Sequence, residues 1–426
     1  MNVTTTTAAN MAPNKDRLRI NGTRLIKRLD ELAEIGKGAN NACCRLALTD
    51  EDKAGRDQVV QWMRELGLTV AVDPMGNIFG LRPGLRDDLA PVMTGSHTDT
   101  VRTGGKYDGN LGVLGGLEVV QTLNEAGIQT QRGLVVAVFT NEEGARFAPD
   151  MMGSLVYVGG MPLEEALAVR AIDGAMLGDE LERIGYAGQA PLGLHQPYAF
   201  VELHIEQGPV LDLEGIRIGA VKDLQGISWQ EITIIGQSNH AGTTPMRMRH
   251  DAGYAASRIA GFVRELADQM GGDQVGTVGK IDLVPNLINV IAARAMVTVD
   301  LRNTDEQLLK DAEQTFATFL QSLAQSEGVQ ISTRQLVRFE PVEFDDAIAT
   351  LVQKHAAAQG LSSRRMTSGA GHDAQMLARI CPSGMVFVPS VGGISHNPAE
   401  HTQAQDLIAG CDVLLATLVE LSEQET

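Results

Sequence analysis

The sequence predicts an α/β protein in which a small domain is inserted into a larger one, and three observations support this. The chain has 426 residues, which is too long for one compact core and favours two domains. From residue 20 to about 219, helical and strand-like runs alternate. From about 220 to about 337 the alternation gives way to a different set of strands and helices. His396, a residue with a metal-binding side chain, lies beyond this segment. We therefore expect one domain from residues 20–219 and 338–426, with an insert at 220–337.

The larger domain has well-marked elements in both of its parts. Helical periodicity covers TDEDKAGRDQVVQWMRELG (49–67), LGVLGGLEVVQTLNEAG (111–127) and residues 345–359, whereas LTVAVD (68–73) and NIFGLR (77–82) are typical of strands. Four apolar strand-like runs complete the pattern: PVMTGSH (91–97), GLVVAVFTNEE (133–143), AFVELH (199–204) and GMVFVPSVGGISH (384–396). Residues 1–19 show no such pattern and are expected to be a disordered lead-in.

The insert is predicted to contain four strands and two helices. Strands are expected at Ile227–Ile235, Val275–Val284, Val290–Leu301 and Val329–Val337, and helices at Asp251–Met270 and Asp305–Ser326. The order β-α-β-β-α-β is the split βαβ arrangement of a small ferredoxin-like domain. Because His396 lies beyond this segment, the small domain is predicted to interrupt the larger one.

Composition narrows the function classes. The formal net charge is −18, which argues against a nucleic-acid partner because basic patches are the usual footprint of such proteins. No stretch of about 18 uncharged apolar residues is present, so no membrane span is expected. The four cysteines form no CxxC pair and indicate no disulfide framework. Since the chain also begins without an apolar signal-peptide core, the cytoplasm is the expected location.

Five residues with metal-binding side chains are spread along the chain, each in a glycine-rich or acidic setting. They are His97, Asp108, Glu143, His204 and His396. Four of them follow the apolar strand-like runs, and in an open α/β sheet chemistry collects at the carboxyl ends of strands. We therefore expect these residues to converge. Histidine and carboxylate ligands together suit Zn, Mn, Co or Ni.

The number of candidates predicts two divalent ions per subunit. One catalytic zinc needs only about three protein ligands, whereas five ligands with one bridging carboxylate fit two ions about 3.5–4 Å apart. Asp108 is the expected bridge because the glycines around it permit close backbone approach. Asp99 follows His97 by two residues, so it is expected on the same side of the strand, where it would orient the His97 ring.

The adjacent acids Glu142 and Glu143 are expected to divide two roles. Neighbouring side chains diverge, so one carboxylate binds metal while the other faces water as the general base of metal-assisted hydrolysis. Most such pairs are solvated turns. This pair ends an apolar run and lies between other candidate ligands, which favours the functional interpretation.

Eight motifs in this order resemble the hydantoinase/carbamoylase group of the di-metal aminoacylase and carboxypeptidase superfamily. They are GSHTDTVRTGGKYDG, NEEGARF, VELHIEQGPVL, SNHAGTTPM, INVI, VDLRN, SGAGHDA and GISHNPAEH, and the resemblance runs from about residue 20 to about 420. It implies a di-metal aminopeptidase-like catalytic domain whose insert acts as a lid and a homodimerisation surface. It also implies the five ligands named above, with Asp108 as the bridge and Glu142 as the base.

The resemblance also changes the interpretation of residues that bind substrate. Taken alone, Arg302 would be a surface salt bridge and His240 a loop histidine bonded to its own backbone. The resemblance implies instead that Arg302 binds the substrate carboxylate, which suits the planar guanidinium. It implies that Asn289 is a polar contact of the lid and that His240 stabilises the oxyanion in the neighbouring subunit. Further substrate-binding candidates are Gln207, Gly371 and His372.

The expected function is hydrolysis of a ureido or linear amide C–N bond next to a carboxylate on a small molecule. N-carbamoyl-L-amino acids are the favoured substrates, giving the L-amino acid, CO2 and NH3. The alternatives are an allantoate amidohydrolase, a β-ureidopropionase and, more distantly, a metallopeptidase or N-deacylase. A binding protein that kept the fold without catalysis would lack Glu142 or several ligands, and all of them are present.

Overall fold

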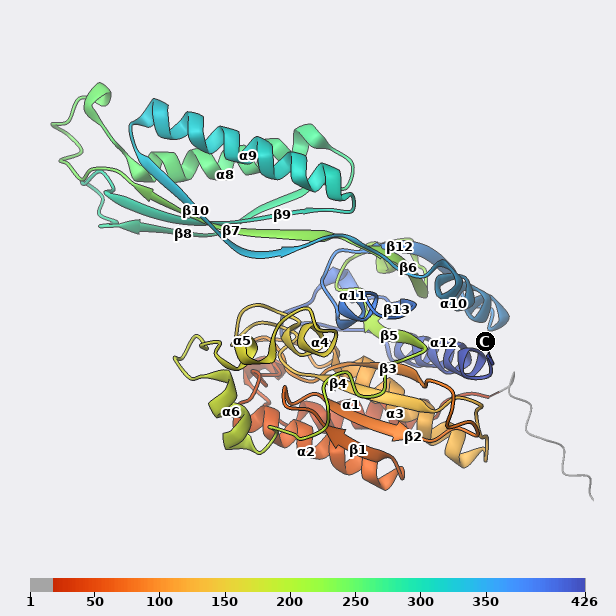
Figure 1. Ribbon diagram of the computed structural model, residues 1–426. Helices are drawn as coiled ribbons and strands as arrows, with labels where there is room; N and C mark the ends of the chain where they lie inside the picture. Colours follow the sequence, from red (N-terminus) through yellow and green to blue (C-terminus); the bar gives the residue numbers. More distant parts are fainter. Residues whose placement is uncertain (1–17, 426) are drawn as a thin grey trace, which may run out of the picture. The chain divides into compact units, whose positions relative to one another are not determined.

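The computed structural model describes residues 18–425 (Figure 1), and most of the predicted disordered segment 1–19 lies outside them. The chain divides into two compact units. The first comprises the chain up to Lys222, Phe344–Met366 and the chain from His372 onward; the second comprises Asp223–Glu343 and Thr367–Gly371. The α/β class is confirmed, and the domain limits inferred from sequence, with an insert at 220–337, stay a prediction.

A mixed sheet with parallel central strands forms the centre of the first unit. Its strands are β1 (Thr69–Val72), β2 (Ile78–Arg82), β3 (Val92–His97), β4 (Leu134–Phe139), β5 (Ala199–Ile205), β6 (Ile218–Leu224), β12 (Ser363–Ser368) and β13 (Ser383–Val388). The strand order is β1-β2-β4-β3-β5-β13-β6, and β12 pairs with β6. The central strands β4, β3, β5 and β13 are mutually parallel. The four strand-like runs predicted from the sequence therefore form neighbouring strands that point the same way.

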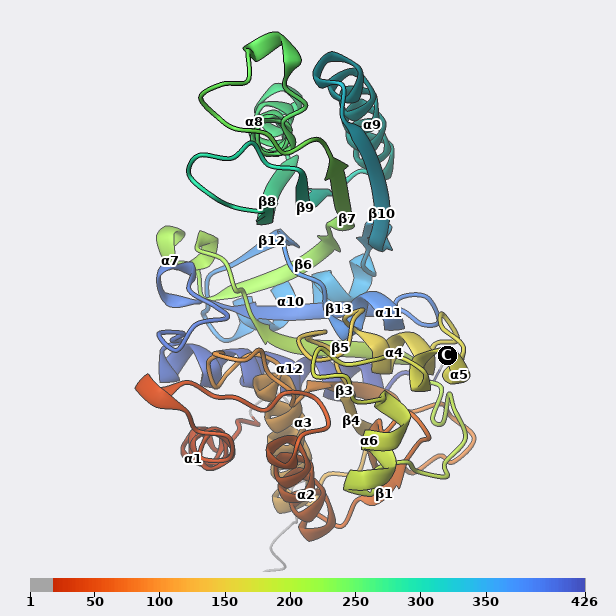
Figure 2. The ribbon, with the colours of Figure 1, turned by 90° about the vertical axis from the view of Figure 1, so that its left-hand side faces the viewer.

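Helices surround this sheet, and several of them, α3 and α12 among them, pack against its central strands. The helices are α1 (Gly22–Ala33), α2 (Asp50–Glu65), α3 (Asn110–Glu125), α4 (Met152–Tyr157), α5 (Leu163–Leu167), α6 (Leu177–Ile184), α7 (Val210–Glu214), α10 (Asp346–Ala358), α11 (Asp373–Leu377) and α12 (Ala404–Ser422). Both α3 and α12 lie against the sheet (Figure 2). They are buried around most of their circumference, as expected for core helices. The predicted helix at 49–67 forms α2, which begins where the Thr49 side chain caps the amide of Asp52.

The second unit is a four-stranded antiparallel sheet with two helices on one face (Figure 1). Its elements are β7 (Gly226–Ile235), α8 (Ala252–Met270), β8 (Val275–Val284), β9 (Arg294–Asn303), α9 (Glu306–Glu327) and β10 (Gln330–Phe339). The strand order is β10-β7-β9-β8, and the short strand β11 (Val342–Glu343) pairs with Asp223 and Leu224. The helices and strands enclose a separate core that includes Ile232, Val263, Val297 and Phe316.

One predicted strand of the second unit begins later than expected. The sequence pattern placed its start at Val290, whereas β9 begins at Arg294. Val290 instead forms an isolated antiparallel bridge with His240, and the amide of Ile291 donates to the carbonyl of Asn239. The first residues of the apolar run therefore pair with another loop before the chain enters the sheet.

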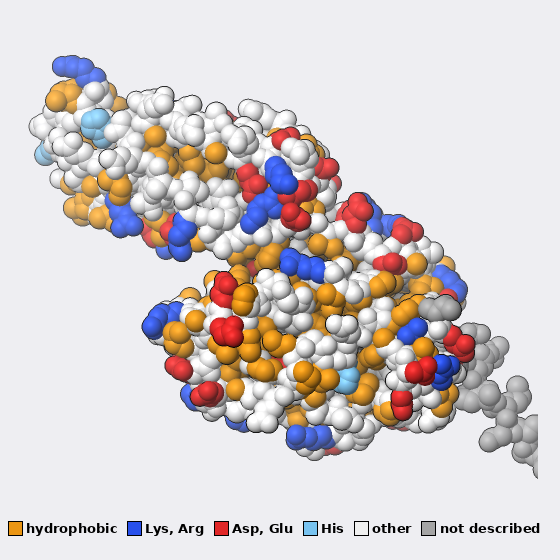
Figure 3. Space-filling view, in the orientation of Figure 1, with side chains coloured by type: hydrophobic (Ala, Val, Ile, Leu, Met, Phe, Trp, Pro, Cys, Tyr) orange, Lys and Arg blue, Asp and Glu red, His pale blue; other side chains and the backbone are white. Residues whose placement is uncertain are grey.

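The surface of the second unit is apolar at one end. Hydrophobic side chains are visible at the end of this unit drawn at left in Figure 3. Among the exposed apolar residues are Met246, Met248, Leu287 and Ile288. They lie on the two loops that carry the bridge between His240 and Val290. Among the described residues, no helix is both long enough and apolar enough to cross a membrane.

Candidate metal centre

The candidate ligands gather at one edge of the parallel sheet. His97 is the last residue of β3, and His204 is the last but one of β5. Glu143 follows the end of β4, and His396 lies on the loop after β13. Because these strands are parallel neighbours, their carboxyl ends meet at the same edge. Asp108 reaches that edge from the loop that precedes α3.

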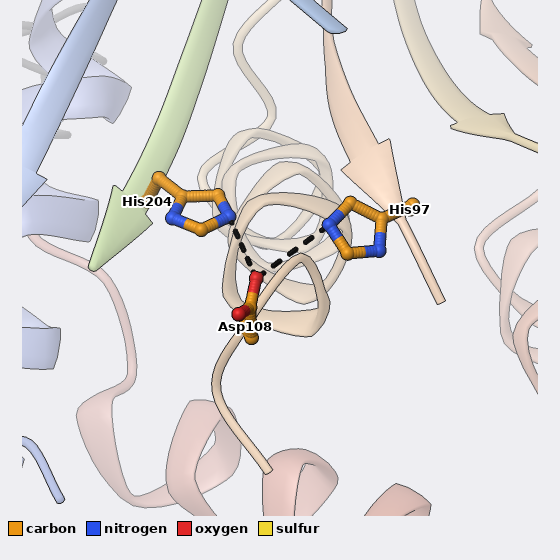
Figure 4. Close-up of side chains that lie close together, drawn as sticks. All are labelled: His97, Asp108 and His204. Carbon is orange, nitrogen blue, oxygen red and sulfur yellow. Dashed lines mark ion pairs between the residues drawn. The ribbon is translucent and has the colours of Figure 1, made fainter. Parts of the chain in front are cut away.

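The five side chains form two clusters that share Asp108. The first cluster is His97, Asp108 and His204; the second cluster is Asp108, Glu143 and His396. In the first, Oδ1 of Asp108 lies 3.2 Å from Nε2 of His204 and 3.6 Å from Nε2 of His97 (Figure 4). In the second, Nε2 of His396 lies 3.3 Å from Oδ2 of Asp108 and 3.2 Å from Oε2 of Glu143. The two oxygens of one carboxylate thus face different clusters.

Backbone contacts orient both imidazole rings of the first cluster. Nδ1 of His97 lies 2.9 Å from the carbonyl oxygen of Asp99, and Nδ1 of His204 lies 2.8 Å from that of Ile205. A ring nitrogen that donates to a carbonyl carries the proton, so in the neutral ring Nε2 has only its lone pair. The lone pair of His204 accepts the amide of Gly109 at 3.2 Å. Nε2 of His97 is buried without a hydrogen-bond partner. This orphaned donor atom fits a metal ion, and histidine and carboxylate donors are suitable ligands for one.

Asp99 contacts the cluster differently from the sequence-based expectation. Its backbone carbonyl, not its carboxylate, orients His97, since Oδ1 lies 4.0 Å from Nδ1 of the ring. The carboxylate instead accepts the amides of Glu142 and Glu143, each at 3.3 Å. Asp99 therefore holds the turn that carries both glutamates, because its carboxylate accepts both of their amides.

Glu142 lies beside the first cluster but belongs to neither cluster. Its Oε2 is 3.3 Å from Nε2 of His97, and the side chain is almost fully buried. Burial raises the pKa of Glu142 well above its usual value, and neighbouring Asp373 and Glu143 add to this against the opposing effect of His97. Burial would also raise the pKa of Asp108, but in the metal-free chain His204, His396 and His97, when protonated, donate to its carboxylate and hold the pKa well below its usual value.

A third group of potential ligands shares His204. Glu202, His204 and His372 lie close together and are all buried. Both oxygens of Glu202 are already occupied, one by the hydroxyl of Ser96 at 2.6 Å and the other by the amide of Ala374 at 2.9 Å. The carboxylate therefore joins β3, β5 and the start of α11, which is a structural arrangement. The ring of His372 packs 4.4 Å from that of His204.

Gln207 contacts the shared carboxylate directly. Its Nε2 donates to Oδ2 of Asp108 at 2.8 Å, and its Oε1 is buried without a partner among the described residues. The backbone of Gln207 has a φ of 58°, and its amide donates to the hydroxyl of Ser390. A buried acceptor without a donor costs free energy, so Oε1 is a suitable acceptor for an N–H group of a ligand.

The remaining candidates lie on the second unit. Nδ1 of His240 accepts the amides of Gly242 at 3.0 Å and Thr243 at 3.3 Å. Nδ1 therefore has no proton, and the exposed ring presents Nε2–H as a donor. Asn289 is also exposed, and its carbonyl accepts the amide of Ala241, which brings the loops of Asn289 and His240 together.

Arg302 already has partners within the second unit. Its Nε and Nη2 donate to the carboxylate of Asp300, at 2.9 Å for Nη2, and Nη1 donates to the carbonyl of Gly369 at 2.9 Å. The salt bridge predicted for Arg302 from the sequence alone is therefore present, with Asp300 as its partner. The guanidinium is half-buried and lies beside the loop that ends at Gly371.

Sequence reasoning missed three residues that connect the ligand-bearing segments: Glu202, Ser395 and Glu400. Glu202 is a charged residue two positions before His204 in an otherwise apolar strand. Because a strand has a period of two, this position predicts a carboxylate on the ligand side of β5. Ser395 and Glu400 flank His396 in a polar loop, and nothing local in that loop indicates their partners.

Comparisons with known proteins agree on one family. The pattern of peptidase family M20/M25/M40 matches residues 93–420. The N-carbamoyl-L-amino-acid amidohydrolase of Rhizobium meliloti is 42% identical over 412 residues, which cover 97% of this chain and 99% of the relative. The allantoate amidohydrolase of Bacillus subtilis is 34% identical over 396 residues, covering 92% and 96%. The crystal structure of an amidase of the hydantoinase/carbamoylase family from Burkholderia vietnamiensis has a TM-score of 0.90 at 44% identity, covering 96% of this chain and 100% of that one.

Proposed function

This chain belongs to peptidase family M20/M25/M40, and from that membership we propose that it is a metal-dependent hydrolase of linear amide C–N bonds. The resemblance to the hydantoinase/carbamoylase group inferred from the motifs is confirmed by its relatives. The favoured substrate is an N-carbamoyl-L-amino acid, converted with water to the L-amino acid, CO2 and NH3. The name of the more similar of the two relatives supports this choice.

The observation that carries the proposal is the division of Asp108 between the two clusters. One carboxylate oxygen faces His97 and His204, and the other faces His396. That is the arrangement expected of a carboxylate that bridges two ions. We propose that each cluster holds one divalent ion, and Zn, Mn, Co or Ni suit its donors. When bound, such ions supply the Lewis acidity that polarises a carbonyl and makes water a nucleophile near neutral pH.

Glu142 is the proposed general base. Its carboxylate lies next to the first cluster and is held in place by Asp99, which accepts the Glu142 amide. It takes the proton of the attacking water and delivers that proton to the leaving nitrogen. Because the proton moves from water to nitrogen through one carboxylate, Glu142 is unchanged after each turnover. Glu143, held by the same aspartate, remains a ligand of the second cluster.

The second unit is proposed to be a lid of ferredoxin-like architecture that also forms the homodimer. The support is its β-α-β-β-α-β order and the exposed apolar residues near His240 and Asn289. The Nε2–H of His240 is a free donor, suited to the oxyanion that develops on the substrate carbonyl of the neighbouring subunit. Arg302 would bind the substrate carboxylate, with Asn289 as a further polar contact. Gln207, Gly371 and His372 complete the proposed substrate-binding set.

Two related ureido compounds, allantoate and N-carbamoyl-β-alanine, are the alternative substrates. The 34% identical relative is named for allantoate, and N-carbamoyl-β-alanine would make the enzyme a β-ureidopropionase. A metallopeptidase or N-deacylase of the wider family is the more distant alternative. A cytoplasmic location is proposed because the four cysteines are free, which fits a reducing compartment.

The decisive experiment is a substrate panel on metal-reconstituted enzyme. The protein is stripped with a chelator, reloaded with Mn, Zn, Co or Ni, and assayed for ammonia release. N-carbamoyl-L-amino acids are expected to give the highest kcat/KM, above allantoate and N-carbamoyl-β-alanine. Full activity in metal-free protein, verified by elemental analysis, would refute the metal-dependent mechanism. Turnover of peptides alone would refute the proposed substrate class.

A further inference from the structure

Glu400 joins two of the three loops that carry ligands of the second cluster. Its Oε1 accepts the amide of Tyr107 at 3.0 Å and that of Asp108 at 3.4 Å, and its Oε2 lies 2.9 Å from the hydroxyl of Ser395. Ser395 immediately precedes His396. The approach is so close that a Cβ on Gly105 would lie 2.2 Å from Oε1 of Glu400. One buried carboxylate therefore contacts the segments that carry Asp108 and His396, two of the three segments that meet in this cluster.

The hydroxyl of Ser395 has two carboxylates within reach. It lies 2.9 Å from Oε2 of Glu400 and 3.3 Å from Oδ2 of Asp108. A hydroxyl has only one proton to donate, and the shorter contact is to Glu400. The Ser395 proton thus points away from Asp108 as long as Glu400 offers an acceptor.

The direction of that proton matters because Oδ2 of Asp108 has few free lone pairs. A carboxylate has about four lone-pair sites, or about two on each oxygen. One on Oδ2 accepts Nε2 of Gln207 at 2.8 Å, and the other side faces Nε2 of His396 at 3.3 Å. If the Ser395 hydroxyl also donated to Oδ2, it would occupy the lone pair with which Asp108 would bind an ion together with His396.

We propose that Glu400 is a positioning residue that draws the Ser395 proton away from Oδ2 of Asp108 and so keeps this oxygen open to the ion of the second cluster. The inference rests on the proposed function, because it concerns the affinity of one of the two proposed ions. Glu400 touches neither substrate nor ion itself. Outer groups that hold a ligand in this way typically change metal affinity by about 10–100-fold when they are replaced.

The substitution Glu400→Gln tests the direction of the proton. The amide oxygen of glutamine can still accept the two backbone amides, so the loop keeps its main anchor. Its NH2 group faces Ser395 as a donor, which forces the hydroxyl proton toward Oδ2 of Asp108. The second substitution Ser395→Ala removes that proton. The double variant is therefore expected to recover what Glu400→Gln alone loses.

The measurement is binding of Co²⁺ to chelator-treated full-length protein at pH 8.5, by equilibrium dialysis and by the visible absorption of bound Co²⁺. Wild type is expected to bind two ions, and His396→Ala identifies which affinity belongs to the second cluster. Glu400→Gln should weaken that same affinity by about 10–100-fold and leave the other unchanged. The double variant should return to within a few-fold of wild type. Asp73→Asn is the matched control, since Asp73 is a buried carboxylate that also accepts two backbone amides, those of Met75 and Asn77.

The outcomes separate this inference from the function on which it rests. Unchanged affinities in Glu400→Gln, equal weakening of both ions, or no recovery on adding Ser395→Ala would each overturn the role of Glu400. In those cases two ions still bind to wild type and the proposed function stands. A wild-type chain that binds fewer than two Co²⁺ ions overturns the two-ion centre and the inference together.

Discussion

Replacing Gly109 with alanine should destroy the first cluster while leaving the fold intact. Gly109 follows Asp108 and precedes α3, and its φ is 64°. A Cβ at this position would lie 2.4–2.5 Å from three atoms of the His97 ring, whereas ordinary contacts begin near 3.4 Å. The ring must therefore move by about 1 Å to relieve the overlap. Because the ring is buried between Asp108 and the Asp99 carbonyl, such a shift takes it out of that position.

The expected magnitude has two separable parts. An alanine at positive φ costs about 1–2 kcal/mol of folding free energy wherever it occurs. Metal–ligand distances tolerate only about 0.2 Å, so a displacement of about 1 Å removes His97 as a ligand. Misplacement of this size near the reacting groups costs about 10²-fold in rate. We therefore expect Gly109→Ala to lose one of two bound ions and at least about 10²-fold in kcat/KM.

Gly127→Ala is the control for the backbone cost. Gly127 lies just past the other end of α3, has a φ of 65°, and a Cβ there would meet no atom within 4 Å. Urea unfolding of the metal-free proteins should show the backbone cost in both variants and a further loss in Gly109→Ala, where the new Cβ displaces the buried ring. Elemental analysis and ammonia release should then show whether metal and activity are lost in Gly109→Ala alone. If Gly109→Ala binds two ions and hydrolyses substrate at the wild-type rate, the position inferred for the His97 ring is wrong.

Three further predictions concern other parts of the chain. Glu142→Gln should keep two ions and lose about 10²–10⁴-fold in kcat. If elemental analysis shows that an ion is lost, the roles of the two glutamates are misassigned. Burial, opposed by hydrogen bonds from Asn77 and Met75, raises the pKa of Asp73 to about 6, from 3.8 in the unfolded chain. Between these values the unfolded chain releases the proton first, so Asp73 lowers stability as pH rises from about 4 to about 6, by up to about 3 kcal/mol. Urea unfolding should therefore show Asp73→Asn gaining stability relative to wild type over this range and no further above it; a constant difference would contradict the shift. Mixing inactive His240→Ala and Glu142→Gln chains should restore up to about a quarter of wild-type activity if the lid acts across a dimer, since about half of the dimers are mixed and each has one complete site. No recovery after subunit exchange verified by mass would place His240 in the site of its own chain or outside catalysis.

The strands and their ends were predictable because local patterns encode them. The runs that precede His97, Glu143 and His204 are apolar and of strand length, and each forms a central strand of the sheet. The rule that chemistry collects at the carboxyl ends of parallel strands then predicts convergence without any knowledge of strand order. The sequence also predicted close backbone approach at the glycines around Asp108, and a Cβ on Gly109 would indeed meet the His97 ring.

The tertiary structure alone decided how the converging residues divide. The sequence predicted Asp108 as a bridge, but which ligands each of its oxygens faces depends on β5 and β13 being neighbours, and these strands are far apart in the chain. The contact between Glu400 and the amide of Tyr107 joins residues separated by 293 positions. No pattern in either segment predicts that the other is its partner. Local sequence determines which face or end of an element carries a polar group, because that depends on near neighbours in the chain. Which two such groups meet depends on the order in which the elements pack, and that order results from burial of the whole sheet between its helices.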